Sequence, residues 1–187
     1  MRLLILLLLP ILLFLHVAAC APGRGLPDLP VVSAPQYRLG PGDGVRLITF
    51  GEEALTGEFR VNDSGAIAVP LVGSVRAAGL TTHQLEGAVA DALKRAKMLR
   101  DPSVVAEIVA YRPIFVLGEV NKPGQYPYQP GMTVVTAAAV AGGFTYRALE
   151  AYASVVRTQD GRATEGKAVR QAFVQPGDVI TIFERRF

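Results

Sequence analysis

The chain has 187 residues, of which 50% are hydrophobic by type and 19% are charged, and its formal net charge is +3. This composition excludes a disordered or collagen-like chain and predicts one or two compact domains. The 19 glycines and 13 prolines favour turns and short strands over an all-helical bundle. A single cysteine excludes an intramolecular disulfide and a zinc site built from several cysteines.

The first 19 residues are typical of a secretory signal peptide. They have a cationic start, and the apolar run from 3 to 15 is shorter than the roughly 20 residues of a membrane-spanning helix. Val17-Ala18-Ala19-Cys20 resembles the bacterial lipobox, so we expect cleavage after Ala19 and lipidation of Cys20. By the same resemblance, alanine at position 21 favours export to the outer membrane. The alternative interpretation is an ordinary signal peptide followed by a bystander cysteine.

Residues 20–36 are predicted to form a lipidated, Pro-rich tether. Four prolines and two glycines interrupt the segment, and it has neither a helical nor a strand period. We therefore expect it to be extended and to space the folded body from the membrane.

A first α+β unit is predicted from residue 37 to residue 111. Gly40-Pro41-Gly42-Asp43-Gly44 has the composition of a turn, and Asn62-Asp63-Ser64-Gly65 predicts a hairpin between the strands on either side of it. The predicted strands of this unit are 45–50, 59–61, 66–69, 71–75 and 103–111.

One helix is predicted in this unit. Thr81 and Gln84 fit a capping box, and Leu80 and Leu85 occupy the hydrophobic-staple positions around it. Apolar residues recur at helical spacing until the basic stretch that precedes Asp101-Pro102, which stops the helix.

A second unit is predicted from residue 112 to residue 187. Thr133 can cap a short helix that Gly142-Gly143 ends. Asn121-Lys122-Pro123-Gly124 and Asp160-Gly161 are predicted turns. The predicted strands are 114–120, 125–128, 152–158 and 179–183.

The two units share a short sequence. Leu39-Gly40-Pro41-Gly42-Asp43 resembles Val174-Gln175-Pro176-Gly177-Asp178, and each precedes a predicted strand. We interpret the pair as a recurring turn in which the aspartate bonds nearby backbone N–H groups, and not as a solenoid repeat.

Together these segments resemble a known family. Tyr37 to Asp43, Val61 to Gly73 and Ala78 to Thr81 are similar to the polysaccharide biosynthesis/export domain of bacterial outer-membrane polysaccharide export lipoproteins. The following segments resemble the β-grasp soluble-ligand-binding (SLBB) domain that comes after it: Phe115 to Val120 with Pro123-Gly124, Ala141 to Phe144, Val155 to Arg157 and Pro176 to Ile180.

This resemblance implies an α+β protein of two small β-rich units that assembles into a periplasmic ring and passes capsular or extracellular polysaccharide outward. It also implies an inner-membrane polysaccharide copolymerase or tyrosine kinase as partner. Family members that form their own pore have further SLBB copies and a C-terminal amphipathic helix. Here only Glu184-Arg185-Arg186-Phe187 follows the last predicted strand, so we expect a short member that relies on a separate outer-membrane pore protein.

Signals for an enzyme are weak, and we predict neither catalysis, a metal nor a cofactor. His83 lies in the first turn of a helix with no cysteine nucleophile and no Gly-x-Ser-x-Gly elbow. Glu52 and Glu53 are the one carboxylate pair considered for glycoside hydrolysis, but adjacent residues seldom face one cleft. The glycines at 40, 42 and 44 precede a strand, unlike a phosphate-binding loop. The mild positive charge forms no basic stripe with aromatics, so no nucleic-acid partner is expected.

Polysaccharide sites combine aromatic faces with convergent polar groups. The candidate ligand-binding residues are Tyr111, Arg112, Tyr126, Tyr128 and Arg147. The alternative is that the tyrosines pack at domain edges and the arginines are solvated. Two further functions stay open at this stage: a lipid-anchored module that binds a soluble ligand or glycan without forming a ring, and a glycan-modifying enzyme that uses Glu52 and Glu53.

Overall fold

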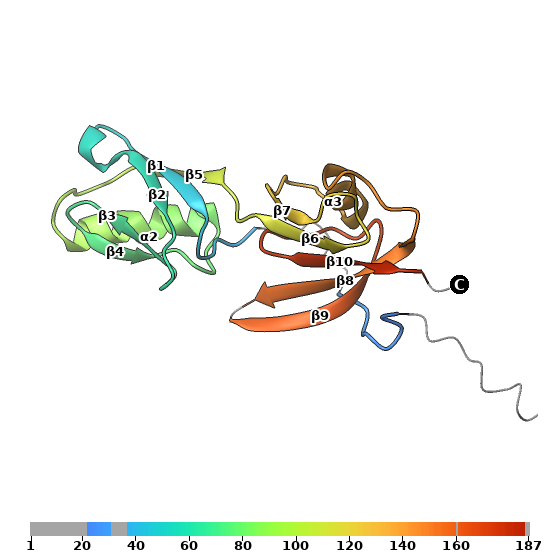
Figure 1. Ribbon diagram of the computed structural model, residues 1–187. Helices are drawn as coiled ribbons and strands as arrows, with labels where there is room; N and C mark the ends of the chain where they lie inside the picture. The colour runs from blue at the N-terminus through green and yellow to red at the C-terminus, as the bar shows by residue number, and fades with distance from the viewer. Residues whose placement is uncertain (1–21, 31–36, 160, 186–187) are drawn as a thin grey trace, which may run out of the picture.

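The computed structural model describes residues 22–30, 37–159 and 161–185. It is α+β, and two β-rich units with one main helix each lie end to end (Figure 1). This confirms the fold class expected from the sequence. The predicted signal peptide and Cys20 lie outside the described residues.

The first unit contains two small sheets and a helix. A three-stranded antiparallel sheet has the order β2-β1-β5, and β3 and β4 form a separate antiparallel hairpin. Helix α2 packs against β5 and β4. The elements are β1 (Gly44–Thr49), the 3-10 turn η2 (Glu53–Leu55), β2 (Gly57–Arg60), β3 (Ala66–Val69), β4 (Gly73–Arg76), α2 (Thr82–Arg95) and β5 (Val104–Ala110).

The second unit is a five-stranded sheet with the order β7-β6-β10-β8-β9. Strand β10 runs parallel to β6, and the other neighbouring strands are antiparallel. Its elements are β6 (Ile114–Gly118), β7 (Gly124–Tyr126), α3 (Val134–Val140), β8 (Ala148–Gln159), β9 (Arg162–Val169) and β10 (Val179–Glu184).

Each unit has its own hydrophobic core. Leu47, Ile67, Leu85 and Leu93 are fully buried in the first, where α2 meets the strands. In the second, Ile114 and Ile180 come from the two parallel strands and pack with residues of α3. Because the two cores are separate, the units are domains joined by a small junction.

The capping box at the start of α2 is confirmed. Thr81 Oγ1 accepts the backbone N–H of Gln84 at 3.2 Å, and the Gln84 side chain accepts the N–H of Thr81 at 3.0 Å. The helix ends at Arg95, earlier than Asp101-Pro102, because Lys97 takes a positive φ of 55°. The N–H of Met98 then reaches the carbonyl of Leu93, which is the pairing of a Schellman motif.

The predicted hairpin around Asn62–Gly65 is wrong in its pairing. The turn itself forms, with Gly65 N–H donating to the Asn62 carbonyl at 2.8 Å. However, β2 pairs with β1, and β3 pairs with β4. The turn therefore carries the chain from one sheet to another.

Strand β9 was absent from the sequence prediction. Its sequence, Arg162–Val169, lacks an apolar alternation, and four consecutive residues at its start are exposed. Its register with β8 runs over eight residue pairs, from Tyr152 opposite Val169 to Gln159 opposite Arg162. Pairing with a long neighbour creates this strand, and local propensity does not.

Residues 22–30, which we call the strap, are docked on the second domain, whereas residues 20–36 were predicted to form an extended tether that spaces the body from the membrane. Leu29 is buried in the second core, and its N–H donates to the carbonyl of Lys167 in β9 at 2.8 Å. The N–H of Lys167 donates in turn to the carbonyl of Pro27 at 2.7 Å. The strap therefore covers the β9 edge of the sheet, as the blue segment beneath β8 and β9 in Figure 1 shows.

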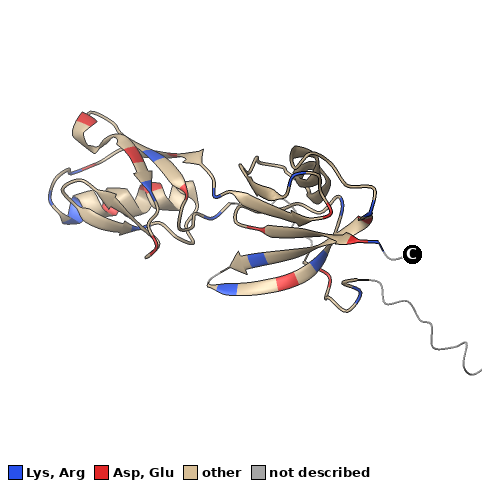
Figure 2. Cartoon of the chain, viewed as in Figure 1, with Lys and Arg blue, Asp and Glu red and all other residues tan. Residues whose placement is uncertain are grey.

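Among the helices of the described ranges, none is long and apolar enough to cross a bilayer. Acidic and basic residues are interspersed over both domains, with basic residues at the end of α2 and in the loop after it (Figure 2).

Candidate functional site at the domain junction

The junction is built around the turn formed by Gly40, Pro41, Gly42 and Asp43. The N–H of Asp43 donates to the carbonyl of Gly40 at 3.1 Å, and Gly42 takes a φ of +97°. Proline at the second position and a positive-φ glycine at the third are the requirements of a type II turn. The turn delivers a fully buried carboxylate, that of Asp43, to the end of the first domain that faces the second.

The Asp43 carboxylate is saturated with donors. Oδ2 accepts the hydroxyl of Tyr37 at 2.6 Å and the backbone N–H of Gly40 at 2.8 Å. Oδ1 accepts the backbone N–H of Arg112 at 2.9 Å. A buried carboxylate needs such partners, since desolvation without them is costly. With these bonds made, the group serves as a structural hub and is poorly suited to act as a catalytic base.

Arg112 links the two domains through both its backbone and its side chain. Its Nε lies 3.4 Å from Oδ1 of Asp43, an ion-pair contact without hydrogen-bond geometry. Its Nη2 donates to the hydroxyl oxygen of Tyr37 at 3.2 Å. The guanidinium also lies where a Cβ on residue 40 would be, so glycine at that position makes room for it.

Three tyrosines continue the junction from one domain into the other. The rings of Tyr37 and Tyr111 meet edge to face with centroids 5.1 Å apart, and Tyr111 meets Tyr128 in the same way at 5.4 Å. Burial, followed by the hydrogen bond to Asp43, raises the pKa of Tyr37 well above its usual range. Burial also raises the pKa of Tyr128. The contact between the domains is therefore partly dry where Tyr37 and Tyr128 lie.

The second copy of the turn forms the same device inside the second domain. The N–H of Gln175 donates to Asp178 Oδ2 at 2.7 Å, and Gly177 takes a φ of +89°. Arg157 grips the Asp178 carboxylate with two bonds, Nε to Oδ1 at 3.0 Å and Nη2 to Oδ2 at 2.7 Å. The interpretation of the repeated sequence as a recurring turn with a backbone-bonding aspartate is confirmed.

The five candidate ligand residues do not converge on one place. Tyr111, Arg112 and Tyr128 lie at the junction. The hydroxyl of Tyr126, on β7, donates to the carbonyl of Lys122. Arg147 lies in the loop between α3 and β8 and is paired with Glu184, and that hydrogen bond raises the pKa of its guanidinium. Contact of these five residues with glycan stays a prediction.

The residues weighed for catalysis lie elsewhere. Glu52 and Glu53 border a surface hollow formed by the loop between β1 and β2, lined by residues 48–53 and 56. The side chain of His83 is 94% exposed and contacts Glu86 at 3.0 Å. Within the described ranges, no group of three or more His, Cys, Asp or Glu side chains is placed to hold a metal ion.

The sequence did not predict two residues that the structure shows to be important: Tyr37 at the domain junction and Arg157, the partner of the buried Asp178. Tyr37 was noted only as part of a motif, and Arg157 only as part of another. The signal that was available is the repeated Pro-Gly-Asp, because a buried aspartate calls for a cationic or N–H partner. Which arginine supplies it depends on contacts between residues far apart in the chain.

Comparison with protein families assigns both domains. A model described as polysaccharide biosynthesis/export protein matches residues 31–109. A model of the SLBB domain matches residues 113–167. The two matches meet at the stretch that contains Tyr111 and Arg112.

Curated relatives are exopolysaccharide and polysialic acid proteins. The chain is 35% identical over 121 residues to exopolysaccharide production protein ExoF of Rhizobium meliloti (strain 1021), which covers 59% of this chain and 29% of the relative. It is 30% identical over 119 residues to EPS I polysaccharide export outer membrane protein EpsA of Ralstonia nicotianae (strain ATCC BAA-1114 / GMI1000). This match covers 62% of this chain and 31% of the relative. It is 32% identical over 94 residues to polysialic acid transport protein KpsD of Escherichia coli. This match covers 49% of this chain and 17% of the relative. The chain thus spans less than a third of the length of each of these relatives.

Proposed function

We propose that the chain, in which a polysaccharide biosynthesis/export model matches residues 31–109 and an SLBB model matches residues 113–167, is a non-catalytic component of a conduit that exports capsular or extracellular polysaccharide. The observation that carries this proposal is the consecutive match of the two family models to the two structural domains. The names of the relatives, which include polysaccharide export and polysialic acid transport proteins, support the same substrate class.

The proposed location is the periplasmic face of the outer membrane. The lipobox-like Val17-Ala18-Ala19-Cys20 motivates an anchor on Cys20. Multiple acyl chains hold a protein to a bilayer firmly, whereas one chain is marginal. The relative EpsA is named as an outer membrane protein, which supports this membrane for the present chain.

The proposed partners are polysaccharide, further copies of this chain in a ring, and an inner-membrane polysaccharide copolymerase or tyrosine kinase. A separate outer-membrane pore protein is a further proposed partner. The junction supports a role as a building block, because Asp43 and Arg112 fix one domain against the other and so define the shape that a ring would repeat.

A non-catalytic role is supported by how the buried carboxylates are used. Asp43 and Asp178 are both saturated with N–H, hydroxyl or guanidinium donors. General acid–base catalysis instead needs a group within reach of substrate with its proton free to move. Replacement of Glu52 and Glu53 together is expected to leave glycan turnover unchanged.

The experiment that tests the function is polymer location in a deletion strain. Secreted, cell-bound and periplasmic polysaccharide are compared in the deletion, in the strain complemented with wild type, and in the strain complemented with Cys20→Ala. We expect secretion to be lost in the deletion and restored only by the wild-type, lipidated protein. Normal secretion in the deletion strain would remove the export role.

The size of the mature protein in detergent separates the conduit from the alternative module. A ring-forming protein sediments as an oligomer. A strictly monomeric protein that still binds soluble glycan would favour a lipid-anchored binding module without a translocation ring.

A further inference from the structure

Four basic residues gather where α2 ends. We call them the basic patch: Lys94, Arg95, Lys97 and Arg100. All four are exposed, and no acidic residue lies between positions 94 and 100. Figure 2 shows basic residues here, at the end of the first domain that points away from the second. The patch is therefore a local concentration of positive charge on a chain whose net charge is only +3.

The reversal of the chain after α2 holds these side chains together. Lys97 takes a positive φ of 55°, and the N–H of Met98 donates to the carbonyl of Leu93 at 3.1 Å. These two features turn the loop back along the last turn of the helix. Leu99 is partly buried and packs against the first core, which fixes the loop from beneath. The cations of the loop therefore lie beside those of the helix on a supported surface.

The charges of the basic patch are not neutralised by the protein. Within the part of the chain that the structure describes, none of its four side chains forms an ion pair. Lys94 and Arg95 lie in the last turn of α2, where cations interact favourably with the helix dipole. That effect fades beyond the last turn, so it does not account for Lys97 and Arg100. The patch thus carries more positive charge than the fold uses.

We propose that the basic patch binds the carboxylate groups of an acidic polysaccharide. The inference rests on the proposed export function, and it narrows the substrate class from polysaccharide in general to polymers that contain acidic sugars. Guanidinium groups match carboxylates with two parallel hydrogen bonds, and ammonium groups attract them as point charges. Several such groups side by side suit a polymer that repeats its carboxylate along its length.

The exposure of the patch fits a polymer in transit. Ion pairs in contact with solvent are individually weak and are screened by salt. A transported chain has to be bound strongly enough to enter and weakly enough to leave. Four exposed cations on one surface give an attraction of this kind, because each contact with the polymer forms and breaks independently.

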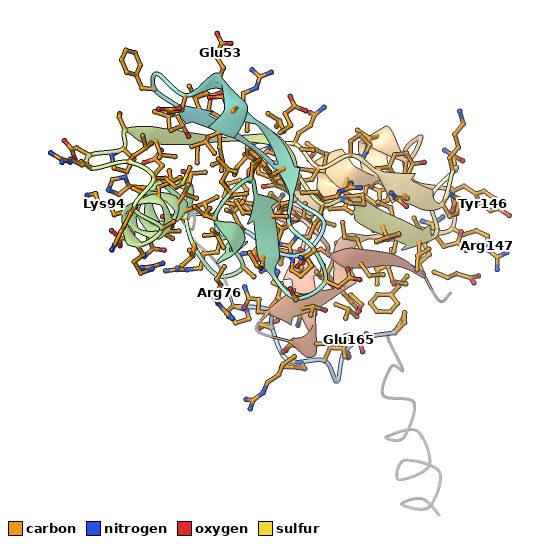
Figure 3. The ribbon with its side chains drawn as sticks, turned by 90° about the vertical axis from the view of Figure 1, so that its left-hand side faces the viewer. Glu53, Arg76, Lys94, Tyr146, Arg147 and Glu165 are labelled. Carbon is orange, nitrogen blue, oxygen red and sulfur yellow. The ribbon has the colours of Figure 1, made fainter. Side chains whose placement is uncertain are left out.

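The opposite charge lies on another side of the first domain. Glu52 and Glu53 are in the loop between β1 and β2, next to Phe50, which is 84% exposed. Figure 3 shows Glu53 and Lys94 projecting from different sides of the domain. An acidic polymer is repelled by the loop and attracted by the patch. No aromatic residue lies between positions 94 and 100 to anchor the patch among lipid headgroups, which favours a polymer over an anionic membrane.

Fluorescence anisotropy of labelled oligosaccharides tests the proposal with the full-length protein in neutral detergent. Oligogalacturonate, which has a carboxylate on each sugar, is the acidic probe, and a dextran oligosaccharide of matched length is the uncharged probe. The patch variant combines Lys97→Glu with Arg100→Glu, both outside α2. The matched control combines Lys122→Glu with Arg162→Glu, which reverses two exposed cations of the second domain and so changes the net charge equally.

We expect the wild type to bind oligogalacturonate and not the dextran oligosaccharide, with an affinity that falls as the NaCl concentration rises. The patch variant should lose about ten-fold in affinity for oligogalacturonate, and the control should lose much less. Lys97→Gln with Arg100→Gln, which removes the attraction without adding repulsion, should give a smaller loss. Circular dichroism should show the same helix and strand content in all of these proteins.

Equal losses in the patch variant and the control, or equal binding of the two probes, would overturn the proposal. Binding to phosphatidylglycerol vesicles without binding to oligogalacturonate would also overturn it and assign the patch to lipid. The secretion test of the proposed function is independent of these variants. Lost secretion in the deletion strain without selective binding would retain the export role and overturn the patch. Normal secretion with selective binding would remove the export role and retain the patch as a site for acidic glycan.

Discussion

Asp43 and Asp178 hold the same position in two copies of one turn, and each accepts the backbone N–H of the residue three positions earlier, from Gly40 at 2.8 Å and from Gln175 at 2.7 Å. The two differ in where their arginine comes from. Arg157 lies in β8 of the same domain as Asp178, whereas Arg112 lies in the stretch between the domains. The same turn and its aspartate thus stabilise the interior of the second domain in one copy and join the two domains in the other.

The buried pair of Arg157 and Asp178 should be strongly required for the second domain. Their side chains are 7% and 1% exposed. Asp178→Ala leaves the guanidinium without its partner, and an uncompensated buried charge costs about 3–5 kcal/mol. We therefore expect urea titration to show a free energy of unfolding of the second domain that is lower by about 3–5 kcal/mol, with the midpoint at a lower urea concentration.

An exposed pair in the first domain provides the control for that measurement. Arg46 and Glu58 are 3.2 Å apart, with side chains 50% and 61% exposed. Exposed pairs contribute about 0–1 kcal/mol, so Arg46→Ala should barely move the unfolding midpoint. Equal losses in the two variants would show that burial does not decide the contribution of these ion pairs.

Tyr37 should make the junction sensitive to alkaline pH. Burial, then the hydrogen bond to Asp43, raises its pKa above the ordinary tyrosine value of about 10. The folded state therefore keeps the phenol proton when the unfolded state has lost it. The stability that this proton contributes is present below about pH 10 and falls as the pH rises above that value. Urea titrations at a series of pH values measure the decline.

Tyr37→Phe should flatten this alkaline decline, since phenylalanine has no proton to lose. It should also lower stability near neutral pH, because Asp43 loses one donor. Tyr146→Phe is the matched control, because Tyr146 is 82% exposed. An unaltered alkaline profile in Tyr37→Phe would contradict the role of this hydroxyl.

Local sequence signals predicted the elements that local chemistry determines. Thr81 and Gln84 predicted the start of α2. The Pro-Gly-Asp repeat predicted two turns and the hydrogen bonds from backbone N–H groups to their aspartates. In each case the bonded groups lie within a few residues of one another. Such contacts depend little on the rest of the fold, so composition and spacing are sufficient to find them.

Contacts between distant residues could not be found in this way. Strand β9 is polar at its start and exists because β8 pairs with it. The strap has one buried apolar side chain, Leu29, among prolines and glycines, and this is too little for a periodic signal. Arg112 is an ordinary cation in the sequence, and its place beside Asp43 follows only when both domains are in position.

Gly40 should control how firmly the domains are held together. A Cβ at this residue would occupy the place of the Arg112 guanidinium, so Gly40→Ala should expel that group from Asp43. We expect a broader distribution of domain orientations by small-angle scattering, with both domains still folded by circular dichroism. Gly87→Ala, in the interior of α2 with open space around it, is the matched control. It should leave the scattering unchanged and stabilise α2 by roughly 0.5–1 kcal/mol. Identical scattering from wild type and Gly40→Ala would argue against a junction held by Arg112.

Gly118 and Gly131 separate backbone strain from steric overlap in the second domain. Their φ angles are nearly equal, +81° and +82°, so alanine at either position pays the left-handed penalty of roughly 1–2 kcal/mol. At Gly118, a Cβ would also collide with the backbone carbonyl of Ile182 in the parallel strand β10, whereas Gly131 has nothing within 4 Å. Relief of that collision would require β6 and β10 to move apart. This would weaken the hydrogen bonds that join these two strands in the sheet. We therefore expect Gly118→Ala to destabilise the second domain well beyond Gly131→Ala in thermal and urea unfolding. Similar losses in the two variants would mean that the strand pair adjusts to the extra methyl group and that positive φ alone explains the glycine at 118.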